Sequence, residues 1–309
     1  MTPETTIHTY DAGTPQDPSV YEELTKQYNV HPGVLTEKDI QKMVPFLQKH
    51  PKLLRKLMHW LKLDKVNATH DRFCDTPGPE FVRRLLFDGF RNTIRVDNEQ
   101  ILRDMPPGAF ITVSNHPLGA LDGIVLIYLV TRYRPQFKVM VNMILNNISG
   151  MRPNFIDVDS LASDNPDRKK VSMLGIRNAL RQLRDGEPIG FFPAGAMSKT
   201  NWKNQMIDRE WQKSILEIIY RANVPVVPIY FHDRNTWFTN LLGHIFWQGR
   251  SLRLPYEVFH KNGKEIHVSI GEPISPEEQR AHGDNPAAVG KYLREKTYEL
   301  RDRYSRKKQ

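Results

Sequence analysis

Asn115, His116 and Asp122 lie close together in the segment FITVSNHPLGALDGIVL, residues 110–126. The histidine follows a short apolar run, and a Pro-Leu-Gly turn comes directly after it. The aspartate could accept a hydrogen bond from one imidazole nitrogen, which would fix the tautomer and leave the other nitrogen as a base. The pattern predicts a proton acceptor for a substrate that brings its own hydroxyl or amine. A histidine that merely starts a helix and is capped by the aspartate would give the same pattern.

A second segment with chemical potential reads FFPAGAMS, residues 191–198. It has the pattern of a strand end that turns through Pro193 and Gly195. Such a glycine turn offers backbone N–H groups to an anion, and the neighbouring Lys199 adds a positive charge. Ser198 lacks the Gly-x-Ser-x-Gly surroundings of a hydrolase nucleophile, so we favour a helix N-cap at this position.

Short apolar runs alternate with amphipathic segments from residue 109 onward. The predicted strands are 109–114, 137–142, 154–159, 188–193, 224–231 and 265–270. The predicted helices are about 118–131, 167–185, 203–221, 236–247 and 285–304. Strands separated by helices predict an α/β fold with a mostly parallel central sheet and helices on both faces. His116 would then lie at the carboxyl edge of the sheet, where open α/β folds bind ligands.

The chain divides into three regions. Residues 1–18 are polar and turn-rich, and we expect a flexible tail there. Residues 19–90 have a helical pattern and would form a helical N-terminal region. Residues 91–309 would form the domain that holds His116.

Segment 52–63, KLLRKLMHWLKL, is the most amphipathic part of the N-terminal region. At 100° per residue, most of its large apolar side chains fall in one arc and its basic side chains fall in the opposite arc. One interpretation is a surface helix that packs on the core and exposes a solvated basic face. The other is an interfacial helix with its apolar face in lipid and its lysines near anionic headgroups.

The order of three segments resembles that of a known family. Asn-His with a nearby Asp comes first, then Phe-Pro-x-Gly-x-x-Ser, then the VPVVPIYF strand at 224–231. This order resembles the glycerolipid and lysophospholipid acyltransferase superfamily over about residues 85–275. The form NHPLGALDG is similar to a bacterial hemolysin-like subgroup that includes lyso-ornithine and lyso-glycine lipid O-acyltransferases. The resemblance implies a glycerol-phosphate acyltransferase-like fold, and transfer of a fatty acyl group from a thioester carrier to a lyso-lipid hydroxyl.

The resemblance also implies roles for individual residues. His116 would be the general base, and Asp122 would orient it. The residues implied to support the oxyanion are Asn115, Gly119 and Gly195. The residues implied to bind substrate are Arg152, Pro193, Ser198 and Lys199. For Arg152 a salt bridge with Asp157 or Asp159 is an equally open interpretation.

Two features depart from the family pattern. Five residues separate His116 from Asp122, where four are usual. Ala194, Ala196 and Met197 stand where the family usually has glutamate, threonine and arginine. The loss of the glutamate and the arginine argues against glycerol-3-phosphate as the acceptor, and somewhat against lysophosphatidic acid. A 1-acylglycerol-3-phosphate acyltransferase and a non-catalytic lipid-binding relative stay open as alternatives.

Composition indicates an anionic partner. The 309 residues carry a formal net charge of +9, which suits an anionic membrane surface, an acidic acyl carrier protein or the phosphates of coenzyme A. Nucleic acid is not expected, because no helix-turn-helix, zinc or RNP-type pattern is visible. The single cysteine, Cys74, excludes an internal disulfide framework.

Targeting and cofactor signals are absent from the sequence. No signal peptide or span of about 18 apolar residues is visible, so we expect a peripheral protein at the cytoplasmic face of the inner membrane. We expect no metal and no cofactor, with acyl carrier protein or coenzyme A thioester as co-substrate. Segment 235–259, which combines two tryptophans with Arg250 and Arg253, would either line an acyl-chain groove, touch the interface or pack in the core.

Overall fold

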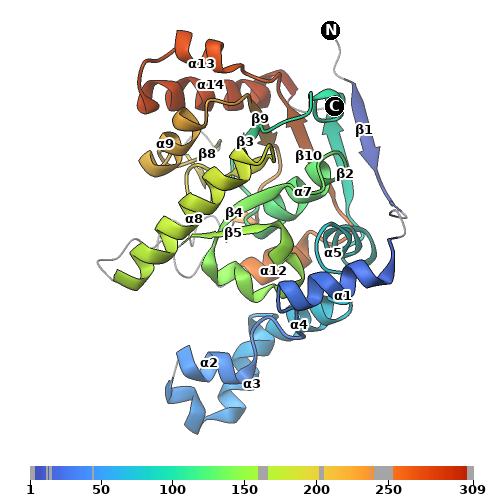
Figure 1. The fold of residues 1–309 in the computed structure, drawn as a ribbon. Coiled ribbons are helices and arrows are strands. Elements are labelled where there is room, and N and C mark those ends of the chain that lie inside the picture. Colours follow the sequence, from blue (N-terminus) through green and yellow to red (C-terminus); the bar gives the residue numbers. More distant parts are fainter. Residues whose placement is uncertain are drawn as a thin grey trace.

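A mixed eight-stranded sheet organises the protein (Figure 1). The computed structural model describes residues 4–11, 13, 16–43, 45–158, 166–201, 205–237, 239 and 253–304. The strands are β1 (Thr5–His8), β2 (Thr93–Asp97), β3 (Ile111–Ser114), β4 (Lys138–Asn142), β5 (Phe155–Val158), β6 (Ile189–Phe191), β9 (Val226–Phe231) and β10 (Glu265–Ile270). Their order across the sheet is β1-β2-β10-β9-β3-β6-β4-β5. All neighbours pair in parallel except β1 with β2 and β10 with β9, which confirms the mostly parallel sheet.

The centre of the sheet places the end of β3 beside two other strand ends. Ile111 pairs with Ile189 of β6 on one side and with Val226 of β9 on the other. All four residues of β3 are buried, as expected for an apolar strand covered on both faces. Since the three strands run in parallel, the residues that follow them meet at one edge, and His116 is among them.

Helices cover both faces of the sheet, as predicted. One apolar cluster joins β2, β9 and β10 to α5 (Pro79–Arg84) and α7 (Ala120–Thr131). On the opposite face, Ile111 and Val113 pack with α8 (Pro166–Arg184), α9 (Lys213–Ala222) and α14 (Pro286–Tyr304). Two short helices flank β10 in the chain, α12 (Leu254–His260) before it and α13 (Pro276–Ala281) after it.

The predicted helix 203–221 is wrong in its first half. A small hairpin of β7 (Lys199–Thr200) and β8 (Met206–Ile207) occupies this part of the chain, and α9 begins only at Lys213. Ser198 therefore precedes a strand and caps no helix. Most of the predicted helix 236–247, and much of segment 235–259, lies outside the described residues.

The N-terminal region is helical, as its pattern indicates. Its elements are α1 (Pro18–Gln27), α2 (Glu37–Met43), η1 (Pro45–Lys49), α3 (Pro51–Trp60), α4 (Leu63–Asp71), α5 and the π-helical turn η2 (Leu85–Gly89). Three short helices follow within the rest of the chain: α6 (Gln100–Asp104), η3 (Met143–Asn147) and η4 (Ser149–Asn154). Figure 1 shows α2 and α3 at the lower end of the molecule, away from the sheet.

The expected tail 1–18 contains an ordered strand. Residues of β1 pair antiparallel with β2, from Thr5 opposite Asp97 to His8 opposite Ile94. The Thr5 hydroxyl also donates a hydrogen bond to Asp97 at 2.9 Å. Local polarity suggested a mobile segment, but these pairings with a strand about ninety positions away supply the hydrogen bonds that order it.

The amphipathic segment 52–63 is shorter as a helix than predicted. α3 ends at Trp60, and Lys62 adopts a left-handed conformation with φ +60° before α4 begins. Leu54 is fully buried with apolar residues of the neighbouring helices, whereas Leu53 and Trp60 are exposed. Of the helices that the structure describes, none is both long enough and apolar enough to cross a membrane.

Candidate active site

The end of β3 fixes the approach of the chain to His116. The side-chain amide of Asn115 donates to the carbonyl of Phe231 at 2.9 Å and accepts from the N–H of Phe231 at 2.7 Å. This pair of bonds extends the contact between β3 and β9 by one residue beyond the regular ladder. Asn115 is fully buried, so it locks His116 at the edge of the sheet.

The ring of His116 contacts Asp122 across the turn that starts α7. Nδ1 of His116 lies 3.0 Å from Oδ2 of Asp122, and the same oxygen accepts the N–H groups of Leu118 at 2.8 Å and Gly119 at 3.0 Å. Gly119 has φ +75°, and a Cβ there would approach Leu254 to 2.6 Å. Glycine is therefore required by both backbone and space. The turn brings the carboxylate back onto the ring six residues earlier.

The side chains of His116 and Asp122 differ in their exposure to solvent. The His116 side chain is 20% exposed, whereas that of Asp122 is not exposed at all. Burial raises the pKa of Asp122, and the hydrogen bond and charge of His116 oppose that rise only in part. A carboxyl group in this setting favours a positive charge on the ring, because that charge compensates its own.

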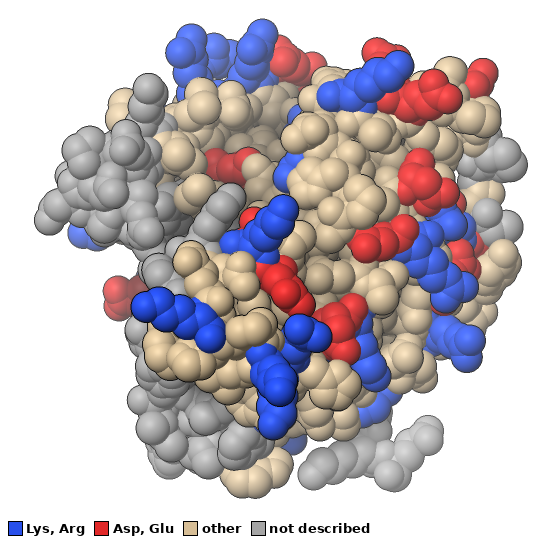
Figure 2. All heavy atoms as spheres, turned by 90° about the horizontal axis from the view of Figure 1, so that it is seen from below, with Lys and Arg blue, Asp and Glu red and all other residues tan. Residues whose placement is uncertain are grey.

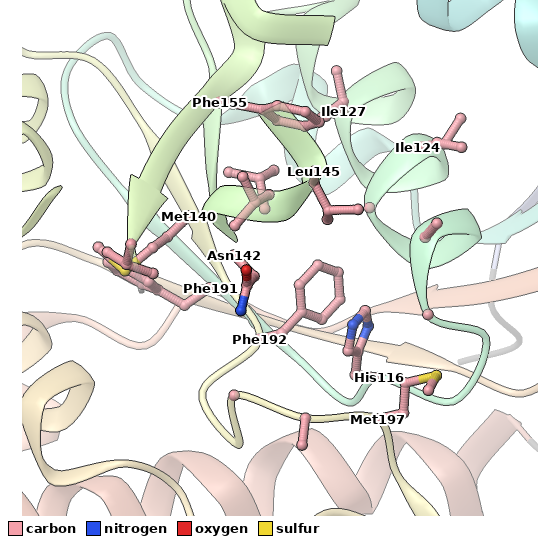
Figure 3. A pocket seen from close by; sticks show the side chains of 18 of the residues that line it. His116, Ile124, Ile127, Met140, Asn142, Leu145, Phe155, Phe191, Phe192 and Met197 are labelled. Atoms are coloured by element: carbon pink, nitrogen blue, oxygen red, sulfur yellow. The ribbon is translucent and has the colours of Figure 1, made fainter. Parts of the chain in front are cut away.

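The open side of His116 faces an apolar cavity of about 180 Å³, far larger than one water molecule requires. Its ring stacks on Phe192, the first residue after β6, with centroids 4.1 Å apart. Figure 3 shows His116 and Phe192 at one end of the cavity, with Ile127 and Phe155 at the other. Further lining side chains are Ile124, Met140, Leu145, Phe191 and Met197.

The main chain of His116 is held from the side opposite Asp122. Its N–H lies 3.0 Å from Oγ of Ser198 and 3.4 Å from Oδ1 of Asp208, and its carbonyl accepts the N–H of Ser198 at 2.8 Å. The Ser198 hydroxyl donates to Asp208 at 2.5 Å. Two buried carboxyl groups thus flank one histidine, the first at its ring and the second at its backbone.

The sequence as a whole matches proteins that transfer acyl groups. A family model described as Acyltransferase covers residues 35–306. The chain belongs to the acyltransferase family. This finding confirms the resemblance seen in the three sequence segments.

Two curated relatives of this acyltransferase are named lyso-glycine lipid O-acyltransferase. The protein of Bacteroides thetaiotaomicron is 30% identical over 256 residues, which cover 80% of this chain and 88% of the relative. That of Phocaeicola vulgatus is 28% identical over 207 residues, 64% of this chain and 71% of the relative. Among solved structures, the 1-acyl-sn-glycerophosphate (LPA) acyltransferase PlsC of Thermotoga maritima aligns with 94% of this chain and 97% of its own, at 16% identity and a TM-score of 0.47.

The three residues predicted to support the oxyanion all have hydrogen-bond partners within the protein. The N–H of Gly119 is bound to Asp122, and the N–H of Gly195 donates to the carbonyl of Phe192 at 2.9 Å. The side-chain amide of Asn115 is hydrogen-bonded to the backbone of Phe231. In this conformation these groups shape the site, since their donors already have acceptors within the protein. Gly119 and Gly195 nevertheless line the cavity.

The predicted substrate-binding residues do not line this cavity. Ser198 is fully buried and engaged with Asp208, and the carbonyl of Pro193 accepts the N–H of Gln212 at 2.8 Å. Lys199 lies in β7, where it pairs with Ile207. Of these residues, Ser198 contacts the backbone of His116, and Pro193 follows Phe192 directly in the chain.

Arg152 lies on a different surface. Its guanidinium donates to the carbonyls of Asn146 at 2.8 Å, Tyr28 at 3.0 Å and Asn29 at 2.6 Å. It lines a polar groove beside β5, together with Asp157. The guanidinium therefore ties α1 to the 3-10 helices after β4 and does not reach the His116 cavity.

Two functional candidates escaped the sequence analysis. Phe192 stood within the quoted FFPAGAMS segment, and an aromatic residue at the end of a strand was the available signal. Asp208 carried no signal at all, because it lies 92 positions from His116 and reaches it only through the β7–β8 hairpin.

Two further clusters of metal-ligating residue types lie in the described part of the chain, His70–Asp71–Cys74 and a more buried one. Asp97, His232 and His267 bring possible ligand atoms within 4.8 Å of one another. Hydrogen bonds occupy these atoms: His267 lies 2.6 Å from Asp97, Ser269 donates to Asp97 at 2.8 Å, and His232 lies 2.8 Å from the Ser269 hydroxyl. The described contacts thus fit a closed hydrogen-bond network around a buried carboxylate.

Proposed function

We propose that this acyltransferase moves a fatty acyl group from a thioester donor to the hydroxyl of a lyso-aminolipid, of the kind that its curated relatives are named for. The observation that carries the proposal is the His116–Asp122 pair at the mouth of an apolar cavity. The ring has one nitrogen engaged and lies against a wall suited to an acyl chain. The names of both relatives support a lyso-glycine lipid as the acceptor.

His116 acts as the general base in the proposed reaction. Asp122 binds Nδ1, which leaves Nε2 to take the proton from the acceptor hydroxyl as its oxygen attacks the thioester carbonyl. The carbon–sulfur bond then breaks, and the imidazolium returns the proton to the departing thiolate. The products are an ester and a free thiol, so atoms and charge balance without a metal or redox partner.

The tetrahedral oxyanion requires donors near the ring. α7 begins at Ala120, which lines the cavity, and the first N–H groups of a helix have no regular carbonyl partner within it, although that of Asp122 donates to the carbonyl of Gly119 at 3.0 Å. We assign the oxyanion to this first turn. Loss of one such donor typically costs about 10²–10³ in kcat.

The cavity lining favours an acyl chain over a phosphate. Among its described residues none is a lysine or arginine, and Ala196 and Met197 stand on its wall where the family usually carries polar or charged residues. An anionic phosphate buried there would lack a counter-charge. This composition supports an acyl chain as the occupant of the cavity, with the charged headgroup of the acceptor outside it.

The α3 end of the molecule is proposed to rest on an anionic membrane. Phe46, Leu53 and Trp60 are 62%, 49% and 68% exposed, and Leu53 and Trp60 lie two helical turns apart on the same side of α3. Figure 2 views this end of the molecule and shows Lys and Arg side chains, with some Asp and Glu between them, amid uncharged surface. Exposed aromatic residues among basic side chains suit the headgroup layer.

Acyl transfer with defined lipids tests the proposed reaction. The purified protein is incubated with lyso-glycine lipid and either acyl carrier protein or coenzyme A thioester, with lysophosphatidic acid as the competing acceptor. We expect ester formation on the lyso-glycine lipid, and near-complete loss of turnover in His116→Ala, by about 10²–10⁴-fold. Turnover of that variant within about tenfold of the unsubstituted protein would exclude His116 as the base.

Vesicle sedimentation tests the membrane contact. We expect the protein to bind vesicles of anionic phospholipid, and a Leu53→Ser, Trp60→Ser variant to bind at least about tenfold more weakly. Met173→Ser, Leu174→Ser is the matched control, because those side chains are also exposed, at 70% and 56%, but lie on α8. Equal weakening in both variants would refute a specific contact through α3.

A further inference from the structure

Asp208 is a buried acid that the reaction as described does not use. Its side chain is 5% exposed, and its Oδ2 atom has no hydrogen-bond partner. No lysine or arginine in the described part of the chain forms an ion pair with it; burial raises the pKa of its carboxyl, and Ser198, His116 and Trp211 oppose that rise. Burying an uncompensated carboxylate is costly, so its presence behind His116 calls for an explanation.

The backbone of Asp208 is fixed by the C-terminal helix. Its N–H donates to the hydroxyl of Tyr298 at 2.7 Å, and Arg294 donates to its carbonyl at 3.0 Å. Both partners belong to α14, which packs on the sheet. The backbone of Asp208 is therefore held at a defined place by α14.

The contacts of Asp208 converge on His116. Its Oδ1 accepts the Ser198 hydroxyl at 2.5 Å, and Ser198 exchanges hydrogen bonds with both the N–H and the carbonyl of His116. The chain of contacts runs from α14 through Asp208 and Ser198 to the backbone of the histidine. Asp122 holds the ring of the same residue from the other side.

We propose that Asp208 is a positioning residue that fixes His116 through Ser198 and, by its charge, favours the positively charged ring formed during proton transfer. This inference rests on the proposed role of His116 as the base. It gives Ser198, the serine of the FFPAGAMS segment, the role of supporting the backbone of His116 in place of a role in substrate binding.

Replacement of the Asp208 carboxyl by an amide distinguishes an effect of its negative charge from an effect of its size and packing. The variant Asp208→Asn keeps an oxygen for the Ser198 hydroxyl but removes the charge. Burial raises the pKa of Asp208, so the folded protein binds the carboxyl proton more tightly than the unfolded chain does. The contribution of Asp208 to the stability of the fold is therefore lost as the pH rises through its folded pKa. The amide is therefore expected to keep or increase thermal stability at neutral pH while activity falls.

Steady-state kinetics across pH 5–9 test the proposal. For Asp208→Asn we expect kcat to fall about ten- to a hundredfold, KM for both substrates to change less than about threefold, and the acid limb of kcat/KM to move to lower pH. The limb moves because a negative charge that favours protonated His116 is gone. Ser198→Ala is expected to lower kcat about three- to tenfold without moving the limb, because the carboxyl group remains.

Three results would overturn the proposal: kcat of Asp208→Asn within about twofold of the unsubstituted enzyme, an unmoved acid limb, or a loss of kcat that parallels a loss of thermal stability. Asp97→Asn is the control, since Asp97 is also buried and bound by a serine, but lies away from the cavity. If Asp208→Asn does not fold, full kcat in Ser198→Ala refutes the tether by itself. Retained turnover in His116→Ala would instead refute the proposed function, whatever Asp208 does.

Discussion

Two histidine–aspartate pairs of this protein share a contact and a stacked ring but differ in exposure. His116 lies 3.0 Å from Asp122 and His267 lies 2.6 Å from Asp97, and each imidazole also stacks on another ring at 4.1 Å. The His116 side chain is 20% exposed at a cavity, whereas the His267 side chain is 1% exposed inside the sheet. Residue types and distances within a pair therefore do not distinguish a catalytic pair from a structural one, but exposure of the histidine to a cavity does.

The two carboxyl groups are shifted in opposite directions. Burial alone would raise the pKa of Asp97, but hydrogen bonds from His267, Ser269 and Thr5 lower it to about 2. Burial raises the pKa of Asp122 in spite of its bond from His116. Asp97 is thus satisfied in its charged form and stabilises the fold. Asp122 keeps a raised pKa although His116, Leu118 and Gly119 all contact its carboxyl, so a positive charge that forms on the ring during the proposed proton transfer would be stabilised by this buried group.

The largest expected contrast is between Asp122→Asn and Asp97→Asn. The first should lower kcat by about 10²–10⁴-fold with the fold intact, because an amide no longer selects the tautomer or supports the imidazolium. The second should leave kcat of the folded enzyme within about twofold. Acyl-transfer rates with matched circular dichroism spectra measure both. Equal losses would remove the distinction between the pairs.

For protein stability the order should be the opposite: loss of the His267 side chain should destabilise the fold more than loss of the His116 side chain. His267→Ala leaves Asp97 buried without its ring partner, and we expect the free energy of unfolding to fall by about 3 kcal/mol or more. His116→Ala opens onto the cavity, where water can replace the ring, so we expect less than half that loss. Urea unfolding at pH 7 compares them, and a greater loss in His116→Ala would contradict the assignment.

Low pH should remove the contribution of Asp97 to the stability of the protein in particular. Because its folded pKa lies near 2, below its ordinary 3.8, its contribution to stability is complete above about pH 4 and is lost as the pH falls towards 2. The shift corresponds to about 2 kcal/mol. Unfolding measured from pH 5 to pH 2 should show this loss in the unsubstituted protein and not in Asp97→Asn. For Asp122, whose pKa is raised, the contribution runs the other way and declines as the pH rises.

The stacked rings give the smallest effects. Phe192→Leu should lower kcat only about three- to tenfold, because the ring of His116 keeps Asp122 but loses one wall. His232→Leu should cost about 1 kcal/mol of stability and leave kcat unchanged, since His232 stacks on a histidine that takes no part in the reaction. A kinetic defect in His232→Leu, measured in the same assay, would show that the second pair reaches the active site.

The sequence predicted the parts of the site that are local in the chain. His116, Asp122 and the intervening turn lie within seven residues, so spacing and turn chemistry were enough to bring them together. The six strands of the main sheet from 109 onward were equally visible, because each is an apolar run between breakers, whereas the short strands β7 and β8 were missed. The family resemblance then ordered these segments into an acyltransferase, which the whole-chain comparison confirms.

Contacts between distant segments were not predictable in this way. The polar segment that holds β1 becomes a strand only because β2 offers an edge, and two of the five residues of β2 are themselves only half-buried. Asp208 reaches His116 through a hairpin where amphipathicity indicated a helix. Gly119 and Gly195 were correctly placed at turns, but their N–H groups are used by partners that a linear pattern cannot name.

The antiparallel strand β1 has a practical consequence for anyone who shortens this protein. Removal of the first ten residues would uncover one whole side of β2, with its row of unpaired amides and carbonyls. Exposed strand edges recruit other chains, so the trimmed protein should form concentration-dependent assemblies that the full chain avoids. An apparent loss of lipid binding in such a protein would then report self-association at the sheet, far from any lipid contact.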